Sequence, residues 1–342
     1  MAQANLTLAL DAMGGDLGPS IVVAALARAL QEFPQVKFVI VGDLAILSPL
    51  LQNHQLAQHP RVTAQHASEV VEMTDKPGTA LRVKPDSSMR VGLELVQQGT
   101  AQALISSGNT GALMSTAYFT LKTLPGVLRP ALISVIPHVH GGHTWLLDLG
   151  ANAVCDADTL FQFGVMGSVQ AQLQLGRQPR VALLNMGAED TKGSDAVKGA
   201  AAQLSASPHI HYVGFIEGDD LFADKADVIV CDGFVGNVAL KACEGLADLL
   251  LAQIKASVKQ HWASRLFAKL FYKRLLKSWD WLKPDHYNGA SLIGLRGVVI
   301  KSHGDANEQA FCSAIRQAVA AVEYALPEQI QDKVEAVLLE ST

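Results

Sequence analysis

Short apolar runs alternate with segments of helical periodicity along almost the whole chain of 342 residues, and this alternation restricts the fold more than any other feature. The runs are four to six residues long and almost continuously hydrophobic, which is typical of strands buried on both faces. Strands are therefore predicted at 6–10, 36–41, 103–106, 131–136, 145–148, 181–185 and 228–231. Helices are predicted at 21–33, 87–97, 110–121, 156–175, 235–255 and 307–324. The pattern indicates an α/β fold with a mainly parallel sheet covered by helices on both faces. Without an internal repeat or a low-complexity linker, residues 1–342 are expected to form a single domain.

Composition narrows the class of protein. Apolar residues make up 49% of the chain and charged residues 17%, which indicates a compact globular protein. The formal charge of −5 argues against a general nucleic-acid binder. The four cysteines are widely spaced and form no C-x-x-C pair, so buried thiols in a reducing cytoplasm are expected. No secretory signal is visible, and the long uncharged stretch 95–121 is broken by polar residues, so no membrane span is expected.

One segment, 255–282, departs from the rest in charge. Seven lysines and arginines lie between 255 and 277 with no acidic residue among them, and aromatic and leucine side chains recur every fourth position. This pattern predicts a basic amphipathic helical segment that protrudes from the domain. Three interpretations remain open: a helix packed on the body, a docking surface for an anionic membrane, or one for an acidic protein partner. The residues expected to dock are Arg265, Lys269, Phe271, Lys273 and Lys277.

The loop directly after the first predicted strand, 11–19, combines two carboxylates with three glycines and ends in Pro19, which suits the first position of a helix. Gly14 and Gly15 allow a sharp turn and a close approach to a ligand, and a helix start favours an anion. Asp16 is the second carboxylate of this loop and a further candidate site residue. An ordinary strand-to-helix turn is the alternative interpretation.

Four more loops repeat this chemistry, each with a small or acidic residue, a glycine and an amide. They are 106–111, 148–152, 185–187 and 232–237. Because such loops follow strands, where open α/β sheets place ligands, a shared cleft suited to phosphate is predicted. The candidate site residues in these loops are Asn109, Asn152, Asn185, Asp232 and Asn237.

Three further candidate residues and one rejected pattern complete the survey of polar residues. Lys192, close to an expected helix start near residue 194, offers phosphate a positive charge, although it could be an ordinary surface lysine. Lys301 and His303 follow the apolar run 297–300; His303 could be a general acid or base, or only a capping histidine. The histidines at 138, 140 and 143 lie in a glycine-containing loop without a nearby carboxylate, so no metal site is expected.

With these motifs in place, the chain resembles the PlsX family of phosphate acyltransferases over nearly its full length. The matching segments are 11–19, 84–90, 107–114, 148–152, 185–193, 231–237 and 297–304. The resemblance implies a fold similar to isopropylmalate dehydrogenases and phosphotransacetylases, a homodimer and a cytoplasmic protein held peripherally at the membrane, where the 255–282 segment corresponds to the family's basic helical hairpin. It also implies transfer of a fatty acyl group from acyl-[acyl-carrier protein] to inorganic phosphate, which gives acyl phosphate for phospholipid synthesis. No cofactor is implied, and the downstream glycerol-3-phosphate acyltransferase is a candidate partner.

The roles expected within this reaction follow from its chemistry. Phosphate is itself the nucleophile, so the protein has to hold it, stabilise the oxyanion and let a thiolate leave. We assign phosphate binding to Gly14, Gly15, Asn109, Asn185 and Lys192, and the oxyanion to Asn237 or Asn152. The remaining catalytic candidates are Asp16 or Asp232 for orienting phosphate, and Lys301 and His303 for the leaving sulfur. Two rival functions are an acyl-CoA-dependent phosphotransacetylase-like enzyme and a non-catalytic, membrane-associated scaffold for the carrier protein.

Overall fold

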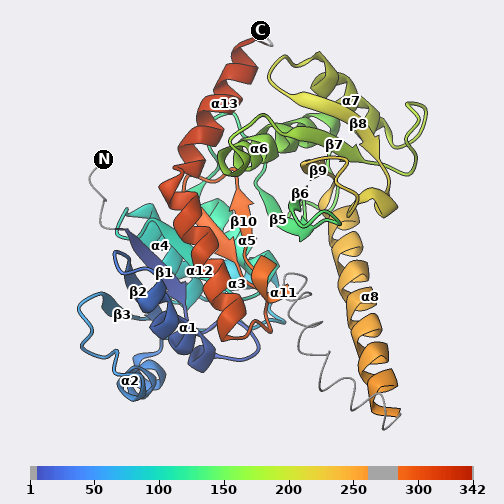
Figure 1. Ribbon diagram of the computed structural model, residues 1–342. Helices are drawn as coiled ribbons and strands as arrows, with labels where there is room; N and C mark the ends of the chain where they lie inside the picture. Colours follow the sequence, from blue (N-terminus) through green and yellow to red (C-terminus); the bar gives the residue numbers. More distant parts are fainter. Residues whose placement is uncertain (1–5, 261–283, 341–342) are drawn as a thin grey trace.

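The computed structural model describes residues 6–260 and 284–340, and one sheet of eleven strands runs through this part of the chain (Figure 1). Its strands are β1 (Thr7–Asp11), β2 (Lys37–Gly42), β3 (Val62–His66), β4 (Ala103–Ser106), β5 (Ala131–Pro137), β6 (His143–Leu147), β7 (Arg180–Leu184), β8 (His211–Ile216), β9 (Val228–Val230), β10 (Ala290–Ile293) and β11 (Val298–Lys301). Across the sheet the order is β3-β2-β1-β4-β11-β10-β5-β6-β9-β7-β8.

The sheet is mainly parallel but changes direction in its middle. Seven of its ten pairings are parallel, and the three antiparallel ones join β11 to β10, β10 to β5, and β5 to β6. As a result β6, β9, β7 and β8 run opposite to β1, β4 and β11. The carboxyl ends of these two groups therefore point to opposite ends of the sheet.

Helices cover both faces. They are α1 (Pro19–Glu32), α2 (Leu44–Asn53), α3 (Pro77–Val83), α4 (Ser88–Gln97), α5 (Thr110–Leu121), α6 (Ala157–Leu175), α7 (Asp195–Ala206), α8 (Gly233–Gln260), α11 (Pro284–Tyr287), α12 (Glu308–Glu323) and α13 (Leu326–Glu340), with a short 3-10 helix at Gly218–Asp220. Side chains of α1, α2, α6, α7, α12 and α13 join one hydrophobic core, and those of α3, α4, α5 and the start of α8 join a second.

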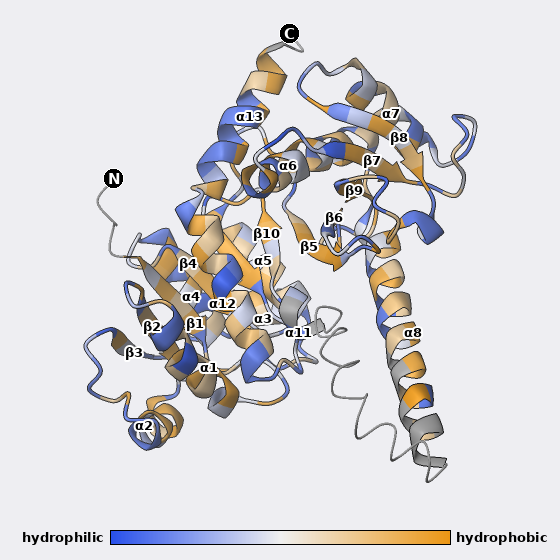
Figure 2. Cartoon of the chain, in the orientation of Figure 1, coloured by the Kyte–Doolittle hydropathy of each residue, from blue (hydrophilic) through white to orange (hydrophobic). Residues whose placement is uncertain are grey.

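The strands separate these two cores because successive side chains alternate between faces. In β1, Leu8 and Leu10 join the first core while Ala9 joins the second. In β4, Ile105 and Leu104 divide in the same way. Figure 2 shows the result as apolar strands and helix faces in the interior, with polar residues concentrated on the outer helix faces.

The predicted fold class is confirmed: all seven predicted strands are present within two residues, between helices on both faces. The basic segment is described only in part. α8 projects from the sheet and includes residues 255–260, whereas Arg265, Lys269, Phe271, Lys273 and Lys277 lie outside the described residues (Figure 1). Within 6–260 and 284–340, none of the helices combines the length and the apolar character that crossing a bilayer requires.

Candidate active site

A buried carboxylate organises the end of β1. Asp11 Oδ1 accepts a hydrogen bond from Ser88 Oγ at 2.6 Å, and Oδ2 accepts one from Ser106 Oγ at 2.6 Å. The Met13 amide also donates to Oδ1, at 3.3 Å. Burial raises the pKa of the Asp11 carboxyl, against the lowering effect of Ser106, Ser88 and the amides of Met13 and Gly14. Asp11 therefore ties the opening loop to the start of α4 and the end of β4.

The opening glycines make close backbone contacts with two neighbouring loops. A Cβ on Gly14 would lie 2.6 Å from Gly108 N, and one on Gly15, whose φ is +90°, would lie 2.9 Å from Gly304 O. Ser107 Oγ donates to Gly14 O at 2.9 Å, and Asp16 N donates to Gly304 O at 2.7 Å. The loops after β1, β4 and β11 thus meet at one end of the sheet, and side chains at both glycine positions are excluded.

Lys301, at the end of β11, is a buried cation in this group of loops. It is only 8% exposed, and its ammonium donates to Ser302 O. Burial lowers the pKa of Lys301 to about 8, while Asp16 opposes this effect and Lys241 adds to it. A buried lysine with its pKa lowered to about 8, beside a glycine loop, is suited to hold an anion or to transfer a proton.

His303 lies two residues further on, with both ring nitrogens engaged. Nδ1 faces Asp305 Oδ1 in a short contact, and Nε2 lies 3.1 Å from Lys241 Nζ of α8. Lys241 was not predicted as a site residue. The signal that could have revealed it is its spacing of four residues from Asn237, which places both on one face of the helix.

Asn109 occupies the predicted loop, but its amide group is used within the fold. Its Oδ1 caps α5 by accepting from Ala112 N at 3.0 Å, and its Nδ2 donates to Met73 O at 2.7 Å and Asp75 O at 3.1 Å. These bonds hold the 73–75 segment against the start of α5. Direct phosphate binding by Asn109 stays a prediction, and it would require one of these bonds to open.

A second group of polar residues surrounds Asp148, at the end of β6. Its Oδ1 accepts from the amides of Leu132 at 2.9 Å and Ala151 at 3.0 Å, and its Oδ2 accepts from Asn152 N at 2.6 Å and Asn152 Nδ2 at 2.9 Å. Asn152 Nδ2 also donates to Pro130 O at 2.8 Å. Burial raises the pKa of the Asp148 carboxyl against these hydrogen bonds. The buried Asn152 therefore shapes this loop with its side chain.

The loop after β9 packs directly on the Asp148 loop. Asp232 Oδ1 accepts from Val235 N at 2.8 Å and so caps the start of α8. The exposed Asn237, one turn further along, faces Gly150, where a Cβ would lie 3.7 Å from the Asn237 Cβ. Gly233 N donates to Asn152 O at 2.7 Å, so Asn152, Asp232 and Asn237 lie on two adjoining loops. A cleft shared with the other predicted loops stays a prediction.

Gly236 provides a test of this packing. A Cβ there would overlap Asp148 O and lie 2.9 Å from Cys231 Sγ. We expect Gly236→Ala to lower the free energy of unfolding by about 3 kcal/mol, measured by urea denaturation, because neither neighbour can move cheaply. Gly245→Ala, on the same helix with open space around the new Cβ, is the matched control and should be neutral or stabilising by up to about 1 kcal/mol. Equal effects of the two changes would contradict this packing.

The third predicted loop follows β7. Asn185 Nδ2 donates to Gly187 O at 3.1 Å and to Lys192 O at 3.3 Å, so the amide closes its own loop. Lys192 is exposed, its amide donates to Glu189 O at 3.0 Å, and within the described chain no ion pair holds its ammonium. The side chain is available to a ligand in solution.

The predicted site residues thus fall into separate groups. Gly14, Gly15, Asp16, Lys301 and His303 lie together at the carboxyl ends of β1 and β11. Asn152, Asp232 and Asn237 lie at the ends of β6 and β9, and Asn185 and Lys192 at the end of β7, on strands of the opposite direction. The Lys241–His303 contact connects the first group to α8 and, through it, to the second. Closure of all three groups around one ligand stays a prediction.

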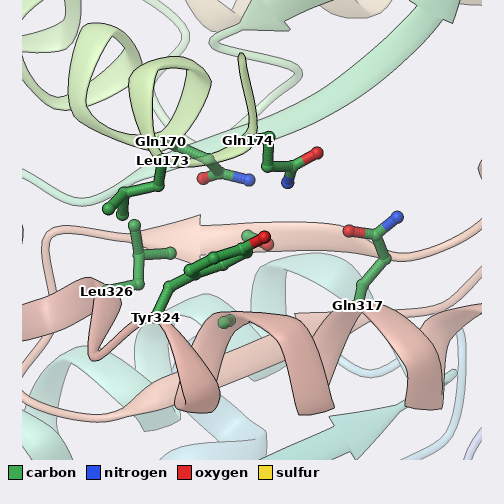
Figure 3. Close-up of a pocket in the computed structure, with 8 residues that line it drawn as sticks. Gln170, Leu173, Gln174, Gln317, Tyr324 and Leu326 are labelled. Atoms are coloured by element: carbon green, nitrogen blue, oxygen red, sulfur yellow. The ribbon is translucent and has the colours of Figure 1, made fainter. Parts of the chain in front are cut away.

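Two other regions have the wrong properties for a substrate site. The cavity between α6, β10 and α12, seen in Figure 3 with Gln170, Tyr324 and Leu326 around it, has a volume of about 10 Å³, which is room for about one water molecule. In the histidine-containing loop, His138 Nε2 lies 3.9 Å from Asp224 Oδ1. Among the described residues no cluster of three histidine, cysteine or acidic side chains is placed to hold a metal ion.

Comparison with known proteins assigns the chain to a family. A family model described as "Fatty acid synthesis protein" matches residues 6–329. The chain belongs to this family. Proteins named phosphate acyltransferase from Idiomarina loihiensis and Photobacterium profundum are 59% and 52% identical over 337 residues, which is 98% of this chain and 99% and 98% of theirs. These relatives confirm the resemblance inferred from the motifs and support an enzyme of the phosphate acyltransferase type.

Solved structures support the fold. A phosphotransacetylase from Streptococcus pyogenes has a TM-score of 0.61 at 18% identity, with 93% of this chain and 94% of that chain covered. A branched-chain phosphotransacylase from Enterococcus faecalis has a TM-score of 0.57 at 17% identity, with 93% and 99% covered. The expected similarity to the phosphotransacetylase fold is confirmed.

Proposed function

We propose that this protein transfers a fatty acyl group from acyl-[acyl-carrier protein] to inorganic phosphate and so supplies acyl phosphate for phospholipid synthesis. The observation that carries the proposal is membership of the family together with near-full-length identity to phosphate acyltransferases. The site supports it because glycine loops and the buried Lys301 meet at one end of the sheet, an arrangement suited to a small anion.

The reaction balances without a further reactant. An oxygen of HPO₄²⁻ attacks the thioester carbonyl carbon, the C–S bond breaks, and the phosphate proton passes to the departing thiolate. Gly14 and Gly15 bring backbone close to phosphate, Lys192 adds positive charge, and Asn237 donates to the oxyanion. Lys301, with its pKa lowered to about 8 by burial, or His303 passes the proton to sulfur. Where phosphate binds as the monoanion, Asp16 or Asp232 accepts its extra proton, so that HPO₄²⁻ is the attacking species.

The decisive assay measures loss of the thioester from acyl-carrier protein with and without phosphate. Phosphate-dependent loss, with acyl phosphate as product, supports the proposal. A faster reaction with acyl-CoA than with acyl-carrier protein would favour a phosphotransacetylase-like enzyme instead. Absence of turnover with either donor, together with binding of the carrier protein, would favour a scaffold.

Lys192→Ala is expected to raise the phosphate KM about 10- to 100-fold, which corresponds to the loss of about 1.5–3 kcal/mol from a charge-assisted hydrogen bond. Thermal stability should not change, because the side chain is exposed. Lys198→Ala, on the neighbouring α7, is the control and should retain the wild-type KM. Wild-type phosphate affinity in Lys192→Ala would make Lys192 an ordinary surface lysine.

We also propose a peripheral place at the cytoplasmic membrane surface for a homodimer, with the 255–282 segment as the docking element and the downstream glycerol-3-phosphate acyltransferase as a partner. The charge pattern of the segment supports this, since basic amphipathic helices bind anionic lipid surfaces. Co-sedimentation with anionic vesicles at low and high salt tests the membrane contact, and sedimentation equilibrium tests the dimer. Absence of co-sedimentation at low salt would exclude the membrane contact and leave a helix packed on the body or an acidic protein partner.

A further inference from the structure

We propose that Lys241 of α8 is a positioning residue that holds the His303 ring in one neutral tautomer at the end of β11. The inference rests on the proposed function only where it concerns turnover. The arrangement of the ring itself can be measured without any activity.

The hydrogen bonds specify where the proton lies on His303. Lys241 Nζ is 3.1 Å from His303 Nε2 and, because an ammonium can only donate, Nε2 has to accept. On the other side of the ring, Nδ1 faces the carboxylate Oδ1 of Asp305, which can only accept, so Nδ1 carries the hydrogen. A cation and an anion on opposite edges therefore select the Nδ1–H form.

The backbone beneath the ring is held independently of Lys241. His303 N donates to Asn288 Oδ1 at 2.9 Å, and Asn288 Nδ2 donates to Ser302 Oγ at 2.8 Å and Ala310 O at 2.7 Å. The loop should therefore keep its place without Lys241, and only the state of the ring should change. This separation allows a positioning role to be distinguished from a structural one.

Lys241 is itself directed toward the ring from the body of α8. Glu244, one turn further along, accepts from Nζ at 2.7 Å, so the ammonium is shared between a carboxylate and the imidazole. The helix is anchored upstream where Gly236 packs against Asp148 O. Asn237 and Lys241 lie four residues apart on one face, and this face links the Asp148 loop to the β11 loop. The position of α8 thereby determines whether His303 is held.

The charged groups at this ring are Lys241 and Glu244 from α8 and Asp305 from its own loop. The ammonium occupies the Nε2 lone pair, so Nε2 cannot carry the ring hydrogen while Lys241 is in place. Removal of Lys241 should therefore make the Nε2–H tautomer accessible, with Asp305 as the one remaining contact that selects Nδ1–H.

The test is a ¹⁵N NMR measurement of the ring nitrogens in histidine-labelled protein at one fixed pH, with His303→Gln used to assign the His303 signals among the eleven histidines. The wild-type protein should show the Nδ1–H pattern, Lys241→Met should show a larger share of the Nε2–H tautomer, and Lys241→Arg should retain the wild-type pattern. The matched control Lys198→Met, which removes a lysine from α7, should leave the pattern unchanged. An unchanged pattern in Lys241→Met, or an equal change in Lys198→Met, would overturn the proposal.

Turnover provides a second readout. Lys241→Met should lower kcat about tenfold, with less effect on the phosphate KM, and Lys241→Arg should restore part of the loss. Combined with His303→Gln, it should add no further loss, because Lys241 acts through that ring. Additive losses would show that Lys241 acts elsewhere. If no acyl transfer is found at all, the proposed function fails while the ¹⁵N signals of the His303 ring still decide the role of Lys241.

Discussion

Replacing Lys301 by methionine is expected to lower kcat at least about 100-fold while making the folded protein more stable. Activity should fall because the only change at the end of β11 is the loss of a buried ammonium beside the glycine loops. Stability should rise because the charged form of a side chain that is 8% exposed is costly to bury, and methionine fills a similar volume without a charge.

The pH dependence of stability follows from the same burial. The pKa of Lys301 is about 8 in the folded protein, below its ordinary value of 10.5, so between these values the unfolded chain binds more protons. Stability from this group therefore rises as pH increases from about 8 to 10.5, and below pH 8 the full cost of about 3 kcal/mol is present. Lys301→Met should remove this pH dependence. Because the bond to Ser302 O is lost as well, the free energy of unfolding at pH 7 should rise by about 2 kcal/mol and not by the full cost of the buried charge.

Urea unfolding at pH 7 and pH 10 measures the change in stability, and kcat at saturating substrates measures the loss of turnover. Lys37→Met, at the exposed start of β2, is the control and should change neither quantity. A Lys301→Met protein that is less stable than wild type but turns over normally would show that this lysine is structural.

Asp11→Ala is expected to lose both stability and activity, in contrast to Lys301→Met. The change leaves the hydroxyls of Ser88 and Ser106 and the Met13 amide without their buried acceptor, at a cost of about 3 kcal/mol. The opening loop would lose its attachment to α4 and β4, so Gly14 and Gly15 would no longer be held against the neighbouring loops. Turnover per folded molecule should therefore fall as well.

Two substitutions make this prediction specific. Asp11→Asn keeps the shape of the side chain and one acceptor oxygen, and the serine hydroxyls can rotate to accept from its amide. It should therefore lower the free energy of unfolding much less than Asp11→Ala does. Asp43→Ala removes a half-buried carboxylate that caps α2 by accepting from Ala45 N at 2.9 Å, and should lower the free energy of unfolding by about 1 kcal/mol without affecting turnover. A stability loss in Asp11→Ala no greater than that in Asp43→Ala would contradict the organising role of Asp11.

The central strands could be predicted because their side chains are apolar on both faces. β1, β4 and β9 are buried throughout or nearly so, and a continuous apolar run reveals such strands directly. The strands without a prediction of their own include the two edges of the sheet, β3 and β8, where most side chains are exposed or half-buried. A strand with one neighbour and a solvated face has no strong apolar pattern to detect.

The hydrophobic pattern could not predict the direction of the strands. β10 was not predicted, and its antiparallel pairings with β11 and β5 leave those two strands parallel to each other. The antiparallel pairing of β5 with β6 then reverses β6, β9, β7 and β8. Hydrophobic periodicity reports that a segment is a strand and which residues are buried, but not which neighbour it pairs with. The sequence therefore did not predict that the loops after β6, β9 and β7 follow strands that run opposite to β1.

The glycine and amide loops could be located from residue types, since glycine, asparagine and aspartate at strand ends serve turns and sites alike. The hydrogen bonds that these side chains make could not be predicted from residue types. The amides of Asn109, Asn152 and Asn185 bond to backbone or side-chain groups of the fold, which only the placement of Met73, Pro130 and Gly187 decides.

By itself, the sequence determined the α/β class, the buried strands, the family and the loops in which polar chemistry gathers, because each depends on residue type at short spacing. Tertiary structure alone decided that Lys301 is buried, that Asp11 joins three segments and that Lys241 reaches His303. In the sequence, 60 residues separate Lys301 from Lys241, and both look like ordinary lysines. Their surroundings come from strands and helices distant in the chain, and burial and charge pairing depend on those surroundings.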